Sequence, residues 1–208
     1  ASIYAKKDIK LINEYMNKSF RYTYMVGVPL VLGLISVSKR FVPIFYGKGY
    51  DMVGTILICI SPIIIFIGLS NVIGTQYQIP TNKQRDYTIS VVAGAVVNFL
   101  LNLILIPVVG VIGAVIATVA AEFIVLVVHY YYVRNDIDVK ESIVCCKNYV
   151  IAGLIMFVVA CAVSFIPCSN NLVIVTCQVI AGVIVYFSIL FIMKDELMEM
   201  IIRKVLRR

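Results

Sequence analysis

Three polar side chains stand within two long apolar segments near the middle of the chain. Asn98 and Asn102 lie in the segment Thr88–Pro107, and Glu122 lies in the next one, Val111–Val133. A carboxylate at the centre of a membrane-spanning helix costs roughly 2.5–3.5 kcal/mol, so Glu122 requires a partner, a proton or a water-filled cavity. Two interpretations stay open for it: a coupling or cavity-facing group, and a buried structural carboxyl.

Small and polar residues recur on one face of each of these segments. Residues four positions apart share a helix face, and rows of small residues let two helix backbones approach closely. The rows are Ser90, Gly94, Asn98 and Asn102 in the first segment, and Gly110, Ala114, Thr118 and Glu122 beside Gly113, Ala117 and Ala121 in the second.

The depth of these polar groups can be estimated from the turn at Pro107–Gly110. At about 1.5 Å per residue, Asn98 lies roughly 13 Å deep and Glu122 roughly 16 Å deep. We therefore expect these two side chains to lie near enough to meet across an antiparallel helix pair. The alternative for Asn98 and Asn102 is interhelical hydrogen bonding, worth about 0.6 kcal/mol for each.

The composition requires lipid as the solvent for these segments. The chain is 62% hydrophobic and 14% charged, whereas about a quarter of a soluble domain is charged. Apolar segments of about 20 residues match a hydrocarbon core about 30 Å thick. We predict an all-α fold, a polytopic transmembrane bundle of six spans. They are Tyr22–Ser38, which the apolar stretch Phe41–Tyr46 favours extending to Tyr46, Met52–Ile73, Thr88–Pro107, Val111–Val133, Tyr149–Pro167 and Leu172–Met193.

The positive charge is distributed unevenly between the two sides of these spans. Of the 18 Lys and Arg residues, all but Lys39, Arg40 and Lys48 fall on the side of the N-terminus. This positive-inside pattern predicts that both ends of the chain are cytoplasmic, and it explains the net charge without a nucleic-acid partner. We expect a cytoplasmic interfacial segment at residues 1–21, a six-helix bundle at residues 22–193 and a cytoplasmic basic tail at residues 194–208, which forms an amphipathic helix.

The residue types that carry enzymatic chemistry are sparse. The six cysteines lack CxxC spacing and the chain has one histidine, His129, so no metal site and no cofactor are expected. No nucleophile–base set, carboxylate pair or phosphate-binding loop is recognisable, which argues against an enzyme. The chain begins with Ala1 and shows no cleavable signal peptide, so we expect a piece of a longer protein.

Several of these motifs together resemble a known family of membrane transporters. The marks are Val28-Pro29-Leu30 with Gly33-Leu34, Phe45-Tyr46-Gly47, Ser61-Pro62, Asn71 with Gly74 and Gln76, the basic loop before Tyr87-Thr88, and the polar and small rows of residues 98–122 with Ile106-Pro107. In combination, the sequence over residues 1–195 resembles the polysaccharide flippases of the MOP exporter superfamily, which translocate O-antigen and capsule repeat units.

The resemblance implies a two-lobed flippase of which this chain is the C-terminal part. The implied cargo is an undecaprenyl-diphosphate-linked oligosaccharide, moved across the bacterial inner membrane by alternating access for polysaccharide biosynthesis. Implied partners are membrane lipids, the N-terminal half of the same protein, a polysaccharide polymerase and glycosyltransferases. The apolar last pair of spans would supply a lipid-facing groove for the prenyl tail.

Four basic residues complete the candidate site that the resemblance suggests. Lys39, Arg40, Lys83 and Arg85 lie near the two membrane faces, where they could attract a diphosphate or acidic sugars. The alternative for all four is anchoring at the interface. Together with Glu122, Asn98 and Asn102, they form the predicted substrate and coupling set.

Three other functions remain open from the sequence. A multidrug exporter of the same superfamily, coupled to Na⁺ or H⁺, would require further carboxylates and aromatic residues in a cation pocket, and Glu122 stands alone among the spans. A membrane-embedded transferase acting on polyprenyl-phosphate sugars would require clustered Asp, His or Arg at a membrane face. The third alternative is a structural membrane subunit.

Overall fold

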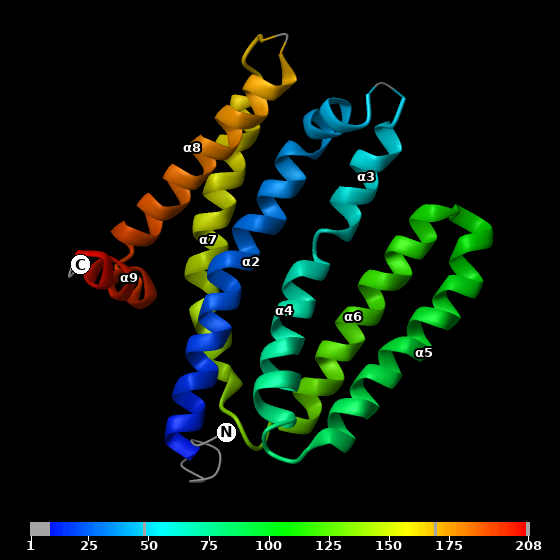
Figure 1. The fold of residues 1–208 in the computed structure, drawn as a ribbon, viewed down its shortest axis with the longest axis vertical. Helices are drawn as coiled ribbons and strands as arrows, with labels where there is room; N and C mark the ends of the chain where they lie inside the picture. Colours follow the sequence, from blue (N-terminus) through cyan, green and yellow to red (C-terminus); the bar gives the residue numbers. More distant parts are fainter. Residues whose placement is uncertain (1–8, 48, 169, 207–208) are drawn as a thin grey trace. The chain divides into compact units, whose positions relative to one another are not determined.

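The computed structural model describes residues 9–47, 49–168 and 170–206, which form helices joined by short turns and contain no strand (Figure 1). Each of the six predicted apolar segments is helical over a length that could cross a membrane, with a break at Pro62 in the second, so the predicted all-α fold is confirmed. The elements are α2 (Ile9–Phe45), α3 (Asp51–Ile60), α4 (Ile63–Ile73), the π-helix η1 (Gly74–Gln78), α5 (Gln84–Val109), α6 (Val111–Val133), α7 (Val139–Val163), α8 (Asn171–Ile192) and α9 (Glu196–Leu206).

Some predicted features fall outside the described residues. These are the first eight residues of the segment 1–21, the predicted outer cation Lys48 and the last two arginines of the tail. Within the described residues, α2 continues without a break through residue 21. The predicted tail helix is present as α9.

Prolines shape the first two spans in different ways. Pro29 and Pro43 lie inside α2, which is continuous to Phe45, as the extension of the first span predicted. The second span instead breaks at Pro62 into α3 and α4. A proline has no N–H for the carbonyl four residues earlier. Here the Ser61 hydroxyl donates to that Ile58 carbonyl at 2.9 Å.

Two compact units divide the contacts of the chain. Unit 1 comprises residues 1–23 and 62–144, and unit 2 comprises residues 24–61 and 145–208. Unit 1 therefore contains the start of α2, the helices α4 to α6 with η1, and the first residues of α7. Unit 2 contains the rest of α2 and of α7, with α3, α8 and α9.

The α5–α6 hairpin dominates unit 1, with its two helices antiparallel and side by side (Figure 1). Gly110 forms the turn with φ +60° and ψ −135°, a conformation that residues with a side chain rarely adopt. A Cβ on Gly94 would lie 2.2 Å from Val125 Cγ2, and one on Gly113 would lie 2.5 Å from the Leu105 carbonyl oxygen. The predicted close approach at small residues is therefore confirmed.

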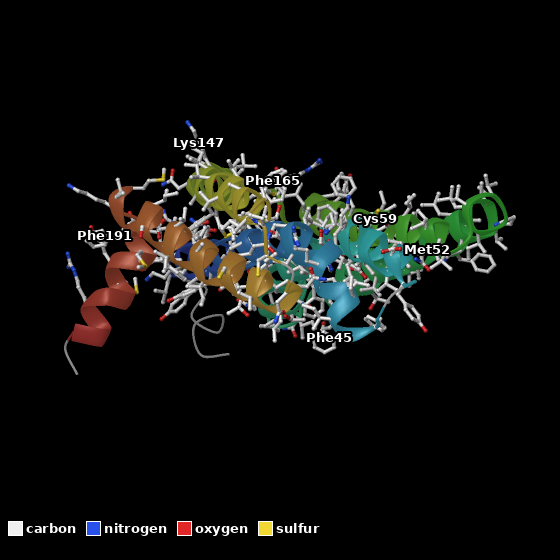
Figure 2. All side chains as sticks on the ribbon, turned by 90° about the horizontal axis from the view of Figure 1, so that it is seen from above. Phe45, Met52, Cys59, Lys147, Phe165 and Phe191 are labelled. Carbon is white, nitrogen blue, oxygen red and sulfur yellow. The ribbon has the colours of Figure 1, made fainter. Side chains whose placement is uncertain are left out.

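Unit 2 packs α7 and α8 against the second half of α2. A Cβ on Gly153 of α7 would lie 2.6 Å from Val28 Cγ1 of α2. Every fourth residue of α8 is buried, namely Ile174, Gln178, Gly182, Tyr186 and Leu190. By contrast, Phe45, Phe165 and Phe191 stand on the outside of this unit (Figure 2). Such exposed aromatic residues fit a surface whose solvent is lipid.

The junction of α8 and α9 is fixed by a buried carboxylate. Asp195 Oδ1 accepts hydrogen bonds from the backbone N–H groups of Leu197 and Met198, at 3.1 and 3.2 Å, and so caps the start of α9. The same oxygen accepts from the Tyr149 hydroxyl of α7 at 3.1 Å. The tail helix therefore leaves α8 in a direction that α7 helps to define.

Candidate functional site

A polar cluster connects the two helices of the α5–α6 hairpin. Asn102 Nδ2 donates to Asn98 Oδ1 at 2.9 Å, and Asn98 Nδ2 reaches Thr118 Oγ1 at 3.5 Å. The Thr118 hydroxyl donates to the Ala114 carbonyl at 2.8 Å. Asn102 Oδ1 is buried without a hydrogen-bond partner among the described residues. The cluster thus holds an unused acceptor inside an apolar helix pair.

Glu122 lies one helical turn from this cluster. The helix register places Gly94 against Ala121, so Asn98 comes opposite Thr118. The structure therefore brings Asn98 together with Thr118, not with Glu122 as the depth estimate suggested. The Glu122 side chain is half-buried, and no described residue forms a hydrogen bond or ion pair with it. Its carboxyl is free for a ligand, a proton or a group outside these residues.

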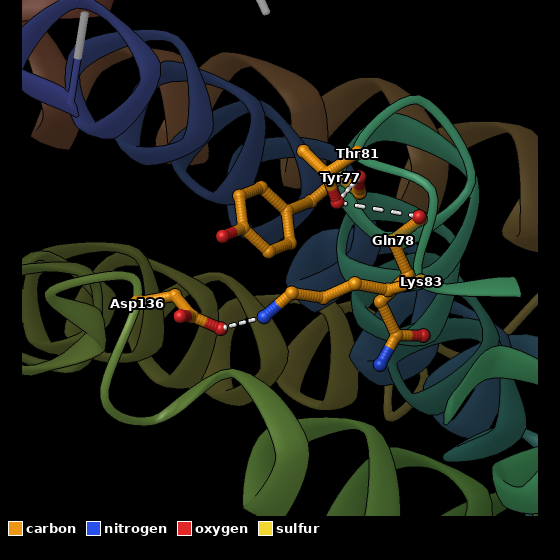
Figure 3. A network of polar contacts seen from close by, with 5 residues as sticks. All are labelled: Tyr77, Gln78, Thr81, Lys83 and Asp136. Carbon is orange, nitrogen blue, oxygen red and sulfur yellow. Dashed lines mark hydrogen bonds and ion pairs between the residues drawn. The ribbon is translucent and has the colours of Figure 1, made fainter. Parts of the chain in front are cut away.

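A second polar network lies at the end of unit 1 that the charge pattern predicts to be cytoplasmic (Figure 3). Lys83 Nζ forms an ion pair with Asp136 at 2.5 Å and lies 5.8 Å from the centre of the Tyr77 ring. The Thr81 hydroxyl donates to the Tyr77 carbonyl at 2.7 Å. Lys83 therefore joins the turn between η1 and α5 to the loop between α6 and α7. Arg85 is exposed and has no partner among the described residues.

The sequence analysis missed a buried pair, Gln78 and His129, that joins η1 to α6. Gln78 Oε1 lies 2.7 Å from His129 Nδ1, and both side chains are almost completely buried. The Tyr87 ring packs against His129, with 5.5 Å between ring centres. A Cβ on Gly74 would lie 2.8 Å from the Tyr87 ring, so glycine is required here. The only signal in the sequence was that glutamine and histidine are polar, which does not indicate that they contact each other.

The two predicted outer cations of unit 2 differ in their contacts. Arg40 donates to the Ser164 carbonyl just after α7, at 2.5 Å, and to Asn171 Oδ1 at the start of α8, at 3.4 Å. Arg40 therefore fastens the α7–α8 turn to α2. Lys39 is exposed and has no partner among the described residues. Consecutive residues of a helix point about 100° apart. Arg40 can therefore face the α7–α8 turn while Lys39 faces outward.

An apolar groove of about 410 Å³ runs along α2, α7 and α8 in unit 2. A Cβ on Gly33 would find no atom within 4 Å, so this stretch of α2 borders open space. Only three lining residues carry polar side chains, Ser36, Gln178 and Tyr186. The lining residues are Met25, Val26, Pro29, Leu30, Gly33, Leu34, Ser36, Val37, Met156, Ala160, Gln178, Val179, Gly182, Val183, Tyr186 and Phe187.

The arrangement of unit 2 suits a long hydrocarbon chain. The lining residues of α2 extend from Met25 to Val37, about 18 Å along the helix axis. Such a length fits an extended chain better than a compact polar molecule. Unit 1, in contrast, offers the part-buried polar side chains of Asn98, Asn102 and Thr118, which suit an ion or a proton.

Comparison with known families gives a match over almost the whole chain. The family model described as lipid II flippase MurJ matches residues 1–205. A solved structure of lipid II flippase MurJ in an inward closed conformation superimposes with a TM-score of 0.79 at 23% sequence identity. The match covers 91% of this chain and 41% of that one, and at this identity it supports the fold alone.

Curated relatives include a putative O-antigen transporter and two flippases. A putative O-antigen transporter of Escherichia coli K12 is 31% identical over 121 residues, 58% of this chain and 29% of the relative. A probable low-salt glycan biosynthesis flippase, Agl15 of Haloferax volcanii, is 23% identical over 185 residues, 89% of this chain and 39% of the relative. Lipid II flippase MurJ of Bacillus subtilis 168 is 30% identical over 112 residues, 52% and 20%. The chain spans less than half of each relative's length.

Proposed function

The chain belongs to the lipid II flippase MurJ family, and from this membership we propose that the full-length protein flips a polyprenyl-linked oligosaccharide across the bacterial inner membrane. The proposed cargo is an undecaprenyl-diphosphate-linked repeat unit for polysaccharide biosynthesis. This choice is supported by the relatives named as an O-antigen transporter and a glycan biosynthesis flippase. We propose a transporter, not an enzyme, in which the remaining part of the protein completes the path.

The apolar groove of unit 2 is the observation that carries this proposal. A lipid-linked oligosaccharide combines a polar head group with a long hydrocarbon tail, and the two parts need different surroundings. The groove offers about 410 Å³ of space along mostly apolar side chains within membrane-spanning helices. The tail comes from lipid, which is as apolar as these side chains, so van der Waals packing and not removal from water would favour its place in the groove. The groove would therefore hold the tail while the head group crosses.

The free polar groups of the structure suggest how the head group and the energy source are handled. Lys39 and Arg85 have no partner among the described residues, so their charges remain available for a diphosphate or an acidic sugar. Arg40 and Lys83 already have structural partners and would act mainly by holding turns in place. We assign a coupling role, toward a proton or a cation, to Glu122 and the neighbouring Asn98–Asn102 cluster.

The membrane arrangement completes the proposal. We place both ends of the chain in the cytoplasm, with residues 1–21 at the interface, residues 22–193 as the bundle and residues 194–208 as a basic tail. The asymmetry of Lys and Arg residues supports this orientation. Lys39 and Arg40 then lie near the outer face, and Lys83 and Arg85 near the cytoplasmic face.

Filling the groove tests the proposed function. Gly33→Phe adds an aromatic ring where the structure leaves open space, and Val158→Phe adds the same ring on an exposed position of α7 outside the groove. In proteoliposomes with the full-length protein, we expect Gly33→Phe to slow flipping of a fluorescent undecaprenyl-diphosphate oligosaccharide by at least about tenfold, the effect of roughly 1.4 kcal/mol. Val158→Phe should flip the lipid at the normal rate.

The same assay distinguishes the alternatives. Equal flipping by Gly33→Phe and the unmodified protein would contradict the role of the groove. Transport of a cationic dye with no flipping of the lipid would replace the proposal by a multidrug exporter. Loss of flipping in both variants would show that added bulk anywhere in unit 2 is harmful, and it would equally count against the groove.

A further inference from the structure

Helix α2 contains a backbone carbonyl that its own helix cannot satisfy. Pro29 has no N–H, so the Met25 carbonyl four residues earlier lacks the donor that an α-helix normally supplies. The Tyr186 hydroxyl of α8 donates to this carbonyl at 2.9 Å. Tyr186 is 1% exposed, so water does not compete freely for the same oxygen. A side chain far along the sequence therefore replaces the hydrogen bond that the proline removes.

The end of α7 presents a similar carbonyl. Ala160 lies in the last turn of α7, and the Ser164 N–H that would bond its carbonyl in a continued α-helix donates to the Cys161 carbonyl at 3.0 Å instead. Gln178 Nε2 donates to the Ala160 carbonyl at 2.9 Å and reaches the Ser36 carbonyl of α2 at 3.5 Å. Gln178 is also 1% exposed. Helix α8 thus supplies a second buried donor to a neighbouring helix.

These two donors stand on the same face of α8, on either side of a stretch that is not tightly filled. Gln178, Gly182 and Tyr186 are four residues apart, so the two polar contacts are separated by about 12 Å. A Cβ on Gly182 would make only ordinary contact, 3.4 Å from Met156 Cγ. All three residues line the groove. Directional hydrogen bonds, and not close packing at Gly182, hold α8 here.

We propose that Tyr186 and Gln178 are positioning residues that hold α8 as the wall of the groove at a spacing open to a hydrocarbon chain. The inference rests on the proposed function for the identity of that chain. Pro29 leaves the Met25 carbonyl without a donor from α2, and the Tyr186 hydroxyl supplies that donor. The two residues therefore act as a pair that holds α8 against α2. Removing the hydroxyl removes the hydrogen bond that docks α8 on α2 and loosens this wall of the groove.

The pairing of Pro29 and Tyr186 permits a specific rescue experiment in the full-length protein. Tyr186→Phe keeps the ring and removes the donor, whereas Pro29→Ala returns an N–H to α2 and satisfies Met25 within the helix. The probe is a diazirine-bearing polyprenyl phosphate in nanodiscs. We expect Tyr186→Phe to raise its half-saturating concentration on the order of tenfold and to lower the thermal midpoint, as a buried carbonyl loses its donor.

In the Pro29→Ala background, Tyr186→Phe should change the thermal midpoint and the labelling far less than it does alone. Independent, additive effects of the two substitutions would overturn the inference, because a tyrosine that acts only by packing gains nothing from an N–H at position 29. Tyr130→Phe is the matched control, since its side chain is exposed on α6, and it should leave both readouts unchanged.

Gln178→Met tests the second contact, since methionine has similar length and no N–H donor. We expect weaker labelling of the groove together with a lower thermal midpoint, and an unchanged protein in both respects would contradict the role of Gln178. The two proposals fail in different ways. If the unmodified protein is not labelled by the prenyl probe, the proposed function fails, while non-additivity of Pro29→Ala and Tyr186→Phe in the thermal midpoint still supports the positioning pair.

Discussion

Glycine has opposite uses at the contact of α5 with α6 in unit 1 and along the groove of unit 2. In the α5–α6 hairpin, Gly94 and Gly113 bring two helices together so closely that a Cβ would overlap the facing atoms. Along the groove of unit 2, Gly33 borders open space and Gly182 makes only ordinary contact. Residue type alone therefore does not reveal whether a small residue allows two helices to pack closely or leaves open space beside a helix. The distinction follows from what the facing helix presents.

Polar residues differ between the two units in the same way. In the hairpin, Asn98, Asn102 and Thr118 contact one another, and one acceptor remains unused. In unit 2, Gln178 and Tyr186 use their donors on backbone carbonyls of other helices. An unsatisfied backbone group in hydrocarbon costs several kcal/mol, so these contacts are a condition for the fold. Gln178 Oε1 also has no hydrogen-bond partner among the described residues, so the two sets differ in what their donors contact: side chains in the hairpin and backbone carbonyls in unit 2.

The largest expected effect comes from adding one methyl group to the hairpin. Gly113→Ala would place a Cβ about 2.5 Å from the Leu105 carbonyl, a backbone atom that cannot turn aside. We expect a loss of about 3 kcal/mol in the free energy of unfolding, measured by denaturation in detergent micelles. Gly33→Ala is the control in unit 2 and should be neutral or stabilising by up to roughly 1 kcal/mol. Equal losses of unfolding free energy for the two variants would contradict the distinction between a closely packed glycine at position 113 and a glycine beside open space at position 33.

An intermediate effect should separate the two neighbouring cations of α2. Arg40→Gln removes the guanidinium that binds the Ser164 carbonyl and Asn171, which should lower the free energy of unfolding by about 1.5 kcal/mol. Lys39→Gln should change it by no more than about 0.5 kcal/mol, since the side chain is exposed. The measurement is the same denaturation curve, and a larger loss from Lys39→Gln would reverse the assignment of roles.

A change in stability as small as that of Lys39→Gln is expected at Glu122. Glu122→Gln keeps the shape of a half-buried side chain that has no partner among the described residues, so unfolding should change by no more than about 0.5 kcal/mol. If this carboxyl couples transport, flipping should nevertheless fall strongly and lose its dependence on an imposed proton or sodium gradient. Unchanged, gradient-dependent flipping would show that the hairpin serves structure alone.

Much of the fold was predictable because consecutive residues determine the length and the polarity of each span. The six spans, the Gly110 turn and the face shared by Ser90, Gly94 and Asn98 all follow from local spacing. The close approach at Gly94 and Gly113 also followed from small residues four positions apart. In these cases the neighbouring helix is adjacent in sequence, so little depends on distant packing.

The rotation of each helix about its axis was not predictable in the same way. In lipid both the buried and the exposed face of a helix are apolar, so no polar face marks the outside. Consequently the pair Gln78–His129 and the Tyr186–Met25 contact escaped the sequence analysis. Pro29 does signal a carbonyl in need of a donor, but only the structure identifies the tyrosine that supplies it. The depth estimate paired Asn98 with Glu122, whereas Asn98 contacts Thr118, because helix register decides which residues face each other.

The most direct test of the account is to map where a prenyl chain lies in the full-length protein. A diazirine-bearing undecaprenyl phosphate, activated in nanodiscs and analysed by peptide mass spectrometry, would report the residues that contact the tail. We predict adducts concentrated on Leu30, Val179 and Val183 of the groove, and their loss in Gly33→Phe. Adducts spread evenly over lipid-facing positions such as Val158 and Phe191, unaffected by Gly33→Phe, would contradict the central claim that the groove binds the lipid tail.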